Sequence, residues 1–462
     1  ILTFPLALTT HKLSFKGKSI LSALLLVPMI MPPFVGAIGV QRLFSRFGSI
    51  NLFLMNNHII SAPIDWLSEG NKFWAVIILE VLHLYPIMFL NLTAALANID
   101  PSLEEIASTL TPKRFRIAKD ISWPLIRPGF FAGATIVFIW ALTDLGTPLL
   151  VGFHECIPVR IFHMVTDIHE NPLGYALVFL VMFIACTFFL MSKLSLKAGR
   201  YQMLARGHVT SPVRPASSKE LFYVYPLFIG VISLAILPHL SVLVTSFADR
   251  WFLTPLPSSY TFAHYAMVFK QELSTIGLKN SFMLSSMSTL LDLVLGFGVA
   301  YIITRKLIPL ASWLDTLVML PLAVPGIVLA FGYVITYTGT FLDPMHNPIP
   351  LLIIAYAIRR LPYMVRSASA GLQQMSIHLE EAASSFGASR FEILRKITFP
   401  LILANLIGGA LLCFSYAMLD VSDSLILAMV DQYYPLTKAI YALYLEQGSG
   451  EYVASSLGVI GM

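Results

Sequence analysis

Long apolar segments recur along the whole chain and limit the folds that it can adopt. Nine of them are long enough to cross a lipid bilayer as helices, which takes about 20 residues. Only helices and closed barrels satisfy their backbone polar groups in lipid, and apolar runs without alternation indicate helices. The predicted spans are 19–43, 73–97, 124–146, 173–191, 221–247, 278–303, 312–337, 350–372 and 400–419.

The composition excludes a soluble globular protein. Hydrophobic residues make up 57% of the 462 residues and charged residues 12%. A soluble domain carries about 25% charged residues, so this chain cannot cover itself with a polar surface. We therefore predict an all-α integral membrane protein that lies in a lipid bilayer.

One charged segment between two apolar runs occurs twice. When the sequence is shifted by 276 residues, the segment 104–126 lies over 380–402 without a gap, and 11 of the 23 aligned residues are identical. Internal repetition of this extent indicates two copies of one structural unit. Each half therefore presents the same polar loop between two predicted spans.

The distribution of Lys and Arg predicts the orientation in the membrane. One alternating set of connections, which includes both repeated loops, holds 20 of these residues, and the other set holds 6. Because Lys and Arg collect on the cytoplasmic side, both repeated loops should be cytoplasmic. The two halves then point the same way and should be related by an axis along the membrane normal.

A basic, polar segment separates the halves. Residues 193–220 have the composition of a cytoplasmic linker and contain the sequence Ser-Pro-Val-Arg-Pro. We predict a first transmembrane domain over 1–192 and a second over 221–462.

The two ends of the chain indicate a truncated repeat. At an offset of 293, residues 1–10 lie over 294–303, the end of a complete span, so they should be the tail of an apolar helix. Residues 452–462 begin an apolar run that is too short to cross a bilayer. We expect the first domain to lack its N-terminal helices and the second to have its last helix cut.

The repeated loop should form two short helices joined by a turn. In the second copy, the acidic and alanine residues 380–383 favour a helix start, and Gly387 can end that helix. Ser389 can cap a second helix that ends where Pro400 opens the next span. Such a helix–turn–helix suits docking into a groove of another protein. An ordinary amphipathic loop would explain one copy better than two matched ones.

The second copy resembles the EAA loop in the membrane subunits of ATP-binding-cassette importers. The matching residues are Glu381-Ala382-Ala383, then Gly387 after three residues, and Ile397 and Pro400 further on. This resemblance implies two tandem copies of the six-helix type I (MetI-like) transmembrane domain. It assigns coupling to the ATPase to both loops, at Glu104, Glu105, Ala107, Thr111, Glu380, Glu381, Ala382, Ala383 and Gly387.

The first copy departs from the family pattern. Ile106 replaces the first alanine, Thr111 replaces the glycine, and Trp123 precedes Pro124. Its docking should therefore be weaker or differently angled.

A narrower resemblance is to fused two-domain permeases of the ferric iron type. It rests on the stretches 32–39, 84–86 and 359–363. It implies a multi-pass protein of the bacterial inner membrane with two kinds of partner, a cytoplasmic dimer of ATP-binding subunits and a periplasmic substrate-binding protein. The chain has no GxxxxGK[ST] phosphate loop, so ATP should be hydrolysed by a separate subunit and this chain should not be an enzyme. We expect no cofactor and no nucleic-acid partner.

Aspartates near the outer ends of two spans have two interpretations. Asp144 and Asp420 are aligned by the 276 offset, and Asp423 follows within a turn. They can line an outer gate and meet a cationic substrate, or they can cap helix ends and pair with arginines.

Two arginines, Arg359 and Arg360, fall in the middle of a predicted span, where charge is expensive. They can satisfy carbonyls left free by Pro362 or pair with a carboxylate such as Glu80 or Asp292. Alternatively they form an anion site, which suits a phosphonate, sulfate or a chelated metal.

The 276 offset aligns Arg359 and Arg360 with His83 and Leu84, one turn after Glu80. The candidates for the translocation path are therefore Asp144, Asp420, Asp423, Glu80, His83, Arg359 and Arg360.

The outer loop of the first half carries residue types that bind transition metals. Their spacings match no standard ligand pattern, and the second-half loop has no histidine or cysteine, so we predict a solvated helix and turn and no metal site. These residues are His154, Glu155, Cys156, His163, Asp167, His169 and Glu170.

Prolines are aligned in the two halves at an offset of 293. Pro28 and Pro32 of the first half match Pro321 and Pro325 of the second. They should set kinks in gate helices.

The predicted function is the fused transmembrane subunit of an ATP-driven importer, with ferric iron as the cargo favoured by the resemblance. Dimerisation of the ATPase would move the two loops together and rock the halves between inward- and outward-facing states. Thiamine, polyamine, 2-aminoethylphosphonate and sulfate are alternative cargoes. A secondary transporter would instead need an intramembrane proton or sodium site and no docking loop. A membrane-embedded enzyme would need a clustered catalytic set, which the spacing of Glu80, His83 and Asp144 does not provide.

Overall fold

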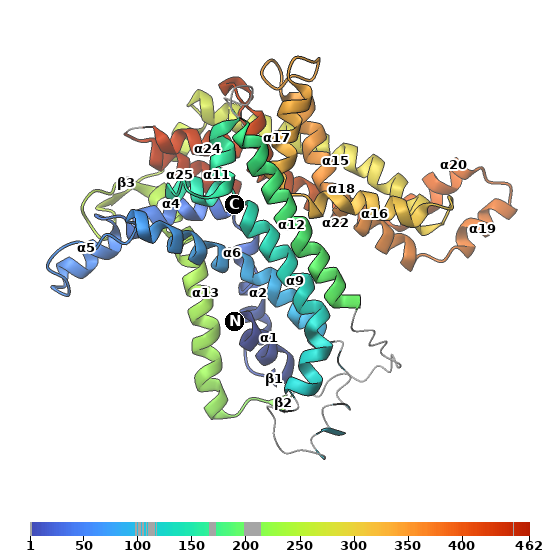
Figure 1. The fold of residues 1–462 in the computed structure, drawn as a ribbon, viewed down its shortest axis with the longest axis horizontal. Coiled ribbons are helices and arrows are strands. Elements are labelled where there is room, and N and C mark those ends of the chain that lie inside the picture. Colours follow the sequence, from blue (N-terminus) through green and yellow to red (C-terminus); the bar gives the residue numbers. More distant parts are fainter. Residues whose placement is uncertain are drawn as a thin grey trace. The chain divides into compact units, whose positions relative to one another are not determined.

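The computed structural model describes residues 2–97, 99, 103, 106, 107, 109, 116, 118–165, 172–197, 214–446 and 448–462. Nearly all of the regular structure in these residues is helical (Figure 1). They form two compact units, one of Ile1–Arg160, Phe183–Thr261 and Met462, and the other of Ile161–Met182 and Phe262–Gly461. Helices α11 (Ile157–Met164) and α12 (Leu173–Lys197) have residues in both.

The first unit is built around the long helix α6. Its helices are α1 (Thr3–Lys12), α2 (Lys18–Leu24), α3 (Val27–Ile30), α4 (Pro33–Phe44), α5 (Ser49–Asn56), α6 (Glu69–Ala97), α9 (Trp123–Thr143), α10 (Gly146–Val151) and α13 (Ser218–Phe247). Helices α1 and α9 pack on α6. Leu92 and Leu96 of α6 are buried there and belong to the hydrophobic core of this unit. Helix α13 packs on α4, where a Cβ on Gly39 would lie 1.9 Å from the Pro238 carbonyl oxygen. Only glycine permits so close an approach.

The second unit has α15, α18 and α22 at its centre. Its helices are α14 (Ala263–Val268), α15 (Glu272–Thr304), α16 (Ala311–Ala323), α17 (Gly326–Tyr337), α18 (Ile349–Gln374), α19 (His378–Ser385), α20 (Arg390–Ile393), α21 (Phe399–Leu401), α22 (Leu403–Met418), α23 (Ser422–Leu427), α24 (Leu436–Leu445) and α25 (Gly450–Gly461), with a 3-10 turn at Asp431–Tyr433. The three central helices pack against one another and bury Met364, Val365 and Leu406.

The described residues also contain four short strands in two pairs. Strand β1 (Leu13–Ser14) pairs in parallel with β2 (Arg214–Pro215), and β3 (Ala248–Arg250) pairs antiparallel with β4 (Ser259–Tyr260). The first pair attaches the end of the predicted linker to the residues that follow α1.

The repeat predicted from the sequence is confirmed by paired irregularities of the backbone. A π-helical turn occupies Ala118–Ser122 in the first half and Leu394–Thr398 in the second, 276 residues later. Helix α10 likewise has its counterpart in α23 at the same offset, with both ends matched. Because π-helical turns are rare, their recurrence at aligned positions indicates one inherited backbone.

Three predicted spans are not straight helices, and the one at 400–419 bends by 73° just after Leu401. The span 312–337 is divided into α16 and α17, which meet at a 98° bend beside Pro325. In 19–43 the corresponding bend, just before Pro33, is 92°. Proline cannot donate the backbone hydrogen bond that would continue the helix, so the expected kinks are complete breaks.

Five helices among the described residues are long and apolar enough to cross a membrane, or eight if each bent pair counts once. The one predicted span not counted among these, 350–372, corresponds to α18, which has 26 residues but carries Arg359, Arg360 and Arg366. The multi-pass, all-α architecture expected from the sequence is therefore present.

The compact units divide the chain differently from the repeat. Helix α13 opens the second half in the sequence repeat, yet it packs within the first unit. The domain limits 1–192, 193–220 and 221–462 remain a prediction about the repeat.

Candidate functional site

The second repeated loop has the predicted helix–turn–helix form. Helix α19 ends at Ser385, and Gly387 takes a left-handed backbone conformation with φ of 85°. Ser389 then caps α20 by a reciprocal capping box with Glu392. In Figure 1 the two short helices extend beyond the end of the bundle of α15, α16 and α18.

The tip of this loop exposes large apolar side chains. Phe386 is 92% exposed and Phe391 is 70% exposed, and they lie on either side of the Gly387 turn. Glu381 and Ala382 are also exposed, and Ala383 is half-buried. Exposed aromatic side chains of this size are typical anchors for another protein.

Glu380 differs from the other coupling candidates because it is buried. Its carboxylate forms an ion pair with Arg305 at the end of α15, with 3.0 Å between Nε and Oε2. The Thr398 hydroxyl donates to its Oε1 at 2.8 Å. Glu380 thus ties α19 to α15 and to the π-helical turn, and it holds the loop in place from inside.

Most of the first repeated loop lies outside the described residues. This applies to the candidates Glu104, Glu105 and Thr111. Ala107 is described and is buried, whereas the neighbouring Ile106 is 58% exposed.

The second-half charges form one buried ion network. Arg360 Nη2 lies 2.6 Å from Asp420 Oδ2, and Arg359 Nη1 lies 3.1 Å from the same atom. Arg359 Nη1 also lies 3.2 Å from Asp423 Oδ2. Two guanidinium groups therefore face two carboxylates, which balances the charge within this network.

The same network links the end of α22 to the start of α23 across the non-helical residues between them. Asp420 Oδ1 accepts the backbone N–H groups of Asp423 at 2.9 Å and Ser424 at 3.1 Å, as a cap of the helix α23. Arg360 donates to the Tyr416 carbonyl at 2.8 Å. This geometry matches one of the two interpretations of the aspartates, in which they cap helix ends and pair with arginines.

Of the carboxylates that the sequence offered as partners, Arg359 and Arg360 pair with Asp420 and Asp423. Glu80 and Asp292, the two examples named for these arginines, are not the ion-pair partners. The reason is tertiary, because α23 returns its first turn to the middle of α18.

The first-half candidates form a separate cluster in the first unit. Asp144 Oδ2 accepts the backbone N–H of Thr147 at 2.9 Å, as Asp420 does for Asp423. The Glu80 carboxyl lies beside that of Asp144. His83 lies within electrostatic range of Asp144, and its Nδ1 donates to the Pro28 carbonyl at 2.9 Å.

The structure therefore brings the candidates together within each half. Several members were missed: Thr147 in the first unit, and Tyr356 and Ser424, whose hydroxyls lie 2.5 Å apart, in the second. The 276 offset could have found Thr147, because it aligns that residue with Asp423.

In the part of the chain that the structure describes, no group of three or more His, Cys, Asp or Glu side chains is placed to hold a metal ion. Of the metal-type residues in the outer loop, Asp167, His169 and Glu170 lie outside the described residues. The Cys156 thiol donates to the Phe153 carbonyl at 3.6 Å.

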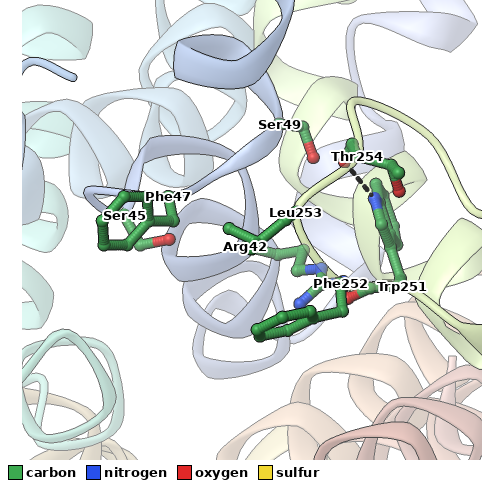
Figure 2. Close-up of a pocket in the computed structure, with 8 residues that line it drawn as sticks. All are labelled: Arg42, Ser45, Phe47, Ser49, Trp251, Phe252, Leu253 and Thr254. Carbon is green, nitrogen blue, oxygen red and sulfur yellow. Dashed lines mark hydrogen bonds between the residues drawn. The ribbon is translucent and has the colours of Figure 1, made fainter. Parts of the chain in front are cut away.

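A small pocket lies in the first unit (Figure 2). It is formed by loops between predicted spans, and the distribution of Lys and Arg predicts that these loops lie on the outer side of the membrane. It has a volume of about 170 Å³. The Arg42 guanidinium donates to the Trp251 carbonyl and stacks 4.5 Å from the centre of its ring. Beside it, Phe252 is 80% exposed, and Leu253 has the strained φ of 51°. The pocket is lined by Arg42, Ser45, Phe47, Ser49, Trp251, Phe252, Leu253 and Thr254.

Comparison with known proteins identifies a family model that covers most of the chain. The model described as a binding-protein-dependent transport system inner membrane component matches residues 3–195 and 292–457. These two matched segments fall in the two halves of the predicted repeat.

Individual relatives carry names of transport permeases. A ferric transport system permease protein of Actinobacillus pleuropneumoniae is 30% identical over 91% of this chain and 60% of its own length. A putative ferric transport system permease of Haemophilus influenzae is 28% identical over 92% of this chain and 67% of its own length. A molybdate/tungstate permease of Thermococcus kodakarensis is 25% identical over 40% of this chain and 71% of its own length. The chain thus spans about 60% of the length of the first of these relatives.

Proposed function

Because the chain belongs to the family of binding-protein-dependent transport system inner membrane components, we propose that it is the permease of an ATP-driven importer of ferric iron. As a member of this family it is a multi-pass inner-membrane transport component and not a catalytic subunit. Its activity, cargo and partners are the content of the proposal.

The observation that carries the proposal is the α19–α20 loop. Its exposed face carries Phe386 and Phe391, while Glu380 and Arg305 fix its base to α15. An apolar tip can bind a partner, and a rigid base can transmit the motion of that partner to the membrane helices. The partner is a dimer of cytoplasmic ATPase subunits, as the resemblance of Glu381-Ala382-Ala383 and Gly387 to the EAA loop implies. ATP is hydrolysed there, and movement of the loops switches the path between its inward- and outward-facing states.

The two loops need not bind equally. Thr111 stands in the first loop where Gly387 stands in the second, and threonine does not readily adopt a left-handed turn. The second loop is therefore the stronger contact with the ATPase.

Ferric iron is favoured over an oxyanion by the charges in the second unit. A site for sulfate or a phosphonate needs cationic groups that are not already neutralised. Arg359 and Arg360 instead make ion pairs with Asp420 and Asp423. The two relatives named for ferric transport also match over most of the chain, and the one named for molybdate and tungstate over 40%.

The translocation path is the remaining part of the proposal. Glu80, His83 and Asp144 are its candidates in the first half, because this cluster carries acidic groups that attract a cation. Arg359, Arg360, Asp420 and Asp423 lie at the same depth in the repeat, where they hold the helix break of the second half.

The outer partner is a periplasmic substrate-binding protein, as the family description implies. The pocket around Arg42 suits an acidic side chain of that protein, because Arg42 supplies a positive charge and Phe252 an exposed apolar surface. The left-handed backbone at Leu253 presents this surface at some conformational cost, which is typical of functional sites.

Reconstitution tests the proposal directly. The permease is placed, with its companion ATPase and binding protein, in liposomes that hold an iron chelator. We expect uptake of radiolabelled ferric iron that requires ATP and the binding protein and persists when ion gradients are collapsed. Uptake that depends on an ion gradient and not on ATP would show a secondary transporter. ATP-dependent uptake of sulfate, thiamine, polyamine or 2-aminoethylphosphonate, with none of iron, would retain the importer and replace its cargo.

A further inference from the structure

The first unit buries two neighbouring carboxyl groups. Glu80 of α6 is only 8% exposed, and its carboxyl lies beside that of the half-buried Asp144, just after α9. Among the described residues, Oε1 of Glu80 has no hydrogen-bond partner. Two ionised carboxylates in contact cannot remain in a medium of low dielectric without a positive charge between or beside them.

The corresponding place in the second half shows how such a charge is normally supplied. There Asp420 is neutralised by Arg359 and Arg360. The aligned residues of the first half are His83 and Leu84. The first half thus has the aspartate and its capping bond but neither guanidinium group.

A second buried oxygen without a hydrogen-bond partner among the described residues, Oγ1 of Thr147, lies next to Glu80. Thr147 is fully buried, and its backbone N–H binds Asp144 at 2.9 Å. Its hydroxyl lies beside Glu80, but no hydrogen bond of normal geometry joins them, and Oγ1 has no other partner within the described ranges. Two carboxyls and one unused hydroxyl thus converge from α6, from the end of α9 and from α10.

The other titratable groups around the pair come from three elements. His83 of α6 has Nδ1 committed to the Pro28 carbonyl. His239 of α13 is 6% exposed and lies within electrostatic range of His83, and Cys156, before α11, lies within range of Asp144. Arg160, which acts on Cys156, is exposed.

We propose that Glu80, Asp144 and Thr147 form a binding site for one exchangeable monovalent cation. The cation is a proton shared by the two carboxyls or a sodium ion held by their oxygens and the Thr147 hydroxyl, because both are bound by hard oxygen ligands. A transition metal or the trivalent cargo would need more donors than this, and no group of three metal-type side chains stands here among the described residues. This resident charge is a property of the permease itself and does not depend on the cargo.

Infrared spectroscopy of the purified permease distinguishes the two sources. The difference spectrum of wild type minus Glu80→Gln, recorded at neutral pH without sodium, isolates the C=O stretch of a protonated carboxyl at this site from that of any other buried carboxyl. For a proton site we expect this band to be present and to persist as sodium is added. For a sodium site the sodium-free spectrum also shows the band, because a proton then supplies the charge, but the band disappears as sodium is added. Radiolabelled sodium then binds one ion per chain in wild type and none in Glu80→Gln.

Two further variants make the test independent of folding. Leu84→Arg copies Arg360 of the second half at a buried position, so it should remove the band and sodium binding, and thermal unfolding shows whether the variant is folded. Asp65→Asn removes an exposed carboxyl of the same unit and should change neither signal. A wild-type protein with no protonated carboxyl in the difference spectrum and no bound sodium would overturn the proposal. A Leu84→Arg protein that keeps the full signal would do the same.

Discussion

The Arg360 guanidinium lies 2.6 Å from the Asp420 carboxylate, although the two residues belong to different helices and 60 positions separate them. Arg360 is 5% exposed and Asp420 is 4% exposed, so neither charge is compensated by water. Removing Arg360 leaves a single guanidinium, that of Arg359, against the two carboxylates of Asp420 and Asp423, so one buried negative charge is no longer balanced. The resulting loss is larger than the net contribution of the Arg360–Asp420 pair itself.

Arg360→Met should therefore destabilise the permease by about 3–5 kcal/mol. The double variant Arg360→Met with Asp420→Asn should recover part of this loss, because it removes both charges. Thermal unfolding in detergent, followed by tryptophan fluorescence, measures both. If the losses of Arg360→Met and of Asp420→Asn, each measured alone, add up in the double variant, the two residues do not interact.

The apolar tip of the second loop gives a prediction about the ATPase. Phe386→Ala should weaken binding of the ATPase subunits by more than 1 kcal/mol, or at least about fivefold, because an exposed aromatic anchor is lost. Phe341 is 93% exposed, compared with 92% for Phe386, but lies in a loop predicted to be on the outer side. Phe341→Ala is thus a matched control and should leave the affinity unchanged. Surface plasmon resonance on permease in nanodiscs measures the dissociation constant, and equal effects of the two changes would rule out this docking face.

The turn of the same loop depends on glycine for its backbone. Gly387 has φ of 85° and open space around the position of a Cβ, so Gly387→Ala strains the turn without a steric clash. We expect a cost of about 1 kcal/mol and a several-fold loss of transport-coupled ATP hydrolysis.

Gly339 provides the control for this change. It has φ of 76°, also with open space around the position of a Cβ. It lies in a loop predicted to be on the outer side of the membrane, away from the ATPase. Gly339→Ala should carry the same strain and leave ATP hydrolysis unchanged. A loss of coupling in both variants would trace the effect to general destabilisation.

The local parts of this loop could be predicted from the sequence, and the tertiary parts could not. Gly387 and Ser389 act on their own neighbours in the chain, so their turn and cap followed from residue type. Glu380 was grouped with the docking residues because its role depends on Arg305, which lies 75 residues away. No local pattern contains such a contact.

The same distinction holds for the spans and the charges. Pro325 correctly predicted a kink, but its size of 98° depends on how α17 packs in the unit. The 276 offset correctly aligned Asp144 with Asp420, and the shared capping geometry followed. Which carboxylate each arginine would contact depended on the return of α23 to α18, which the repeat alone does not specify.

Glu392 predicts how the loop responds to acid. Hydrogen bonds from the Ser389 backbone, followed by those of Lys396 and the Ser389 hydroxyl, lower the pKa of Glu392 from 4.5 to about 2. Since the folded pKa is the lower one, the stabilising cap is complete above about pH 4.5 and is lost as the pH falls towards 2. Hydrogen exchange of the α20 amides should therefore stay constant from neutral pH to about 4.5, after correction for intrinsic rates, and accelerate below it. Glu392→Gln should remove this acid-dependent step, and an unchanged profile in that variant would assign the transition to another group.

The outer pocket leads to a prediction about the substrate-binding protein. Arg42 is held against Trp251 by stacking and by a hydrogen bond to its carbonyl, so its charge occupies a defined position in the pocket. Arg42→Glu should repel an acidic side chain of the docked protein and lower its affinity about tenfold or more, with a weaker dependence on salt than in wild type. Arg250→Glu makes the same change of net charge at an exposed site in the neighbouring strand β3, outside the pocket lining, and should have a much smaller effect. Titration of the binding protein against permease in nanodiscs at two salt concentrations gives both quantities. Equal losses in the two variants would reduce the role of Arg42 to its contribution to the overall charge of this face.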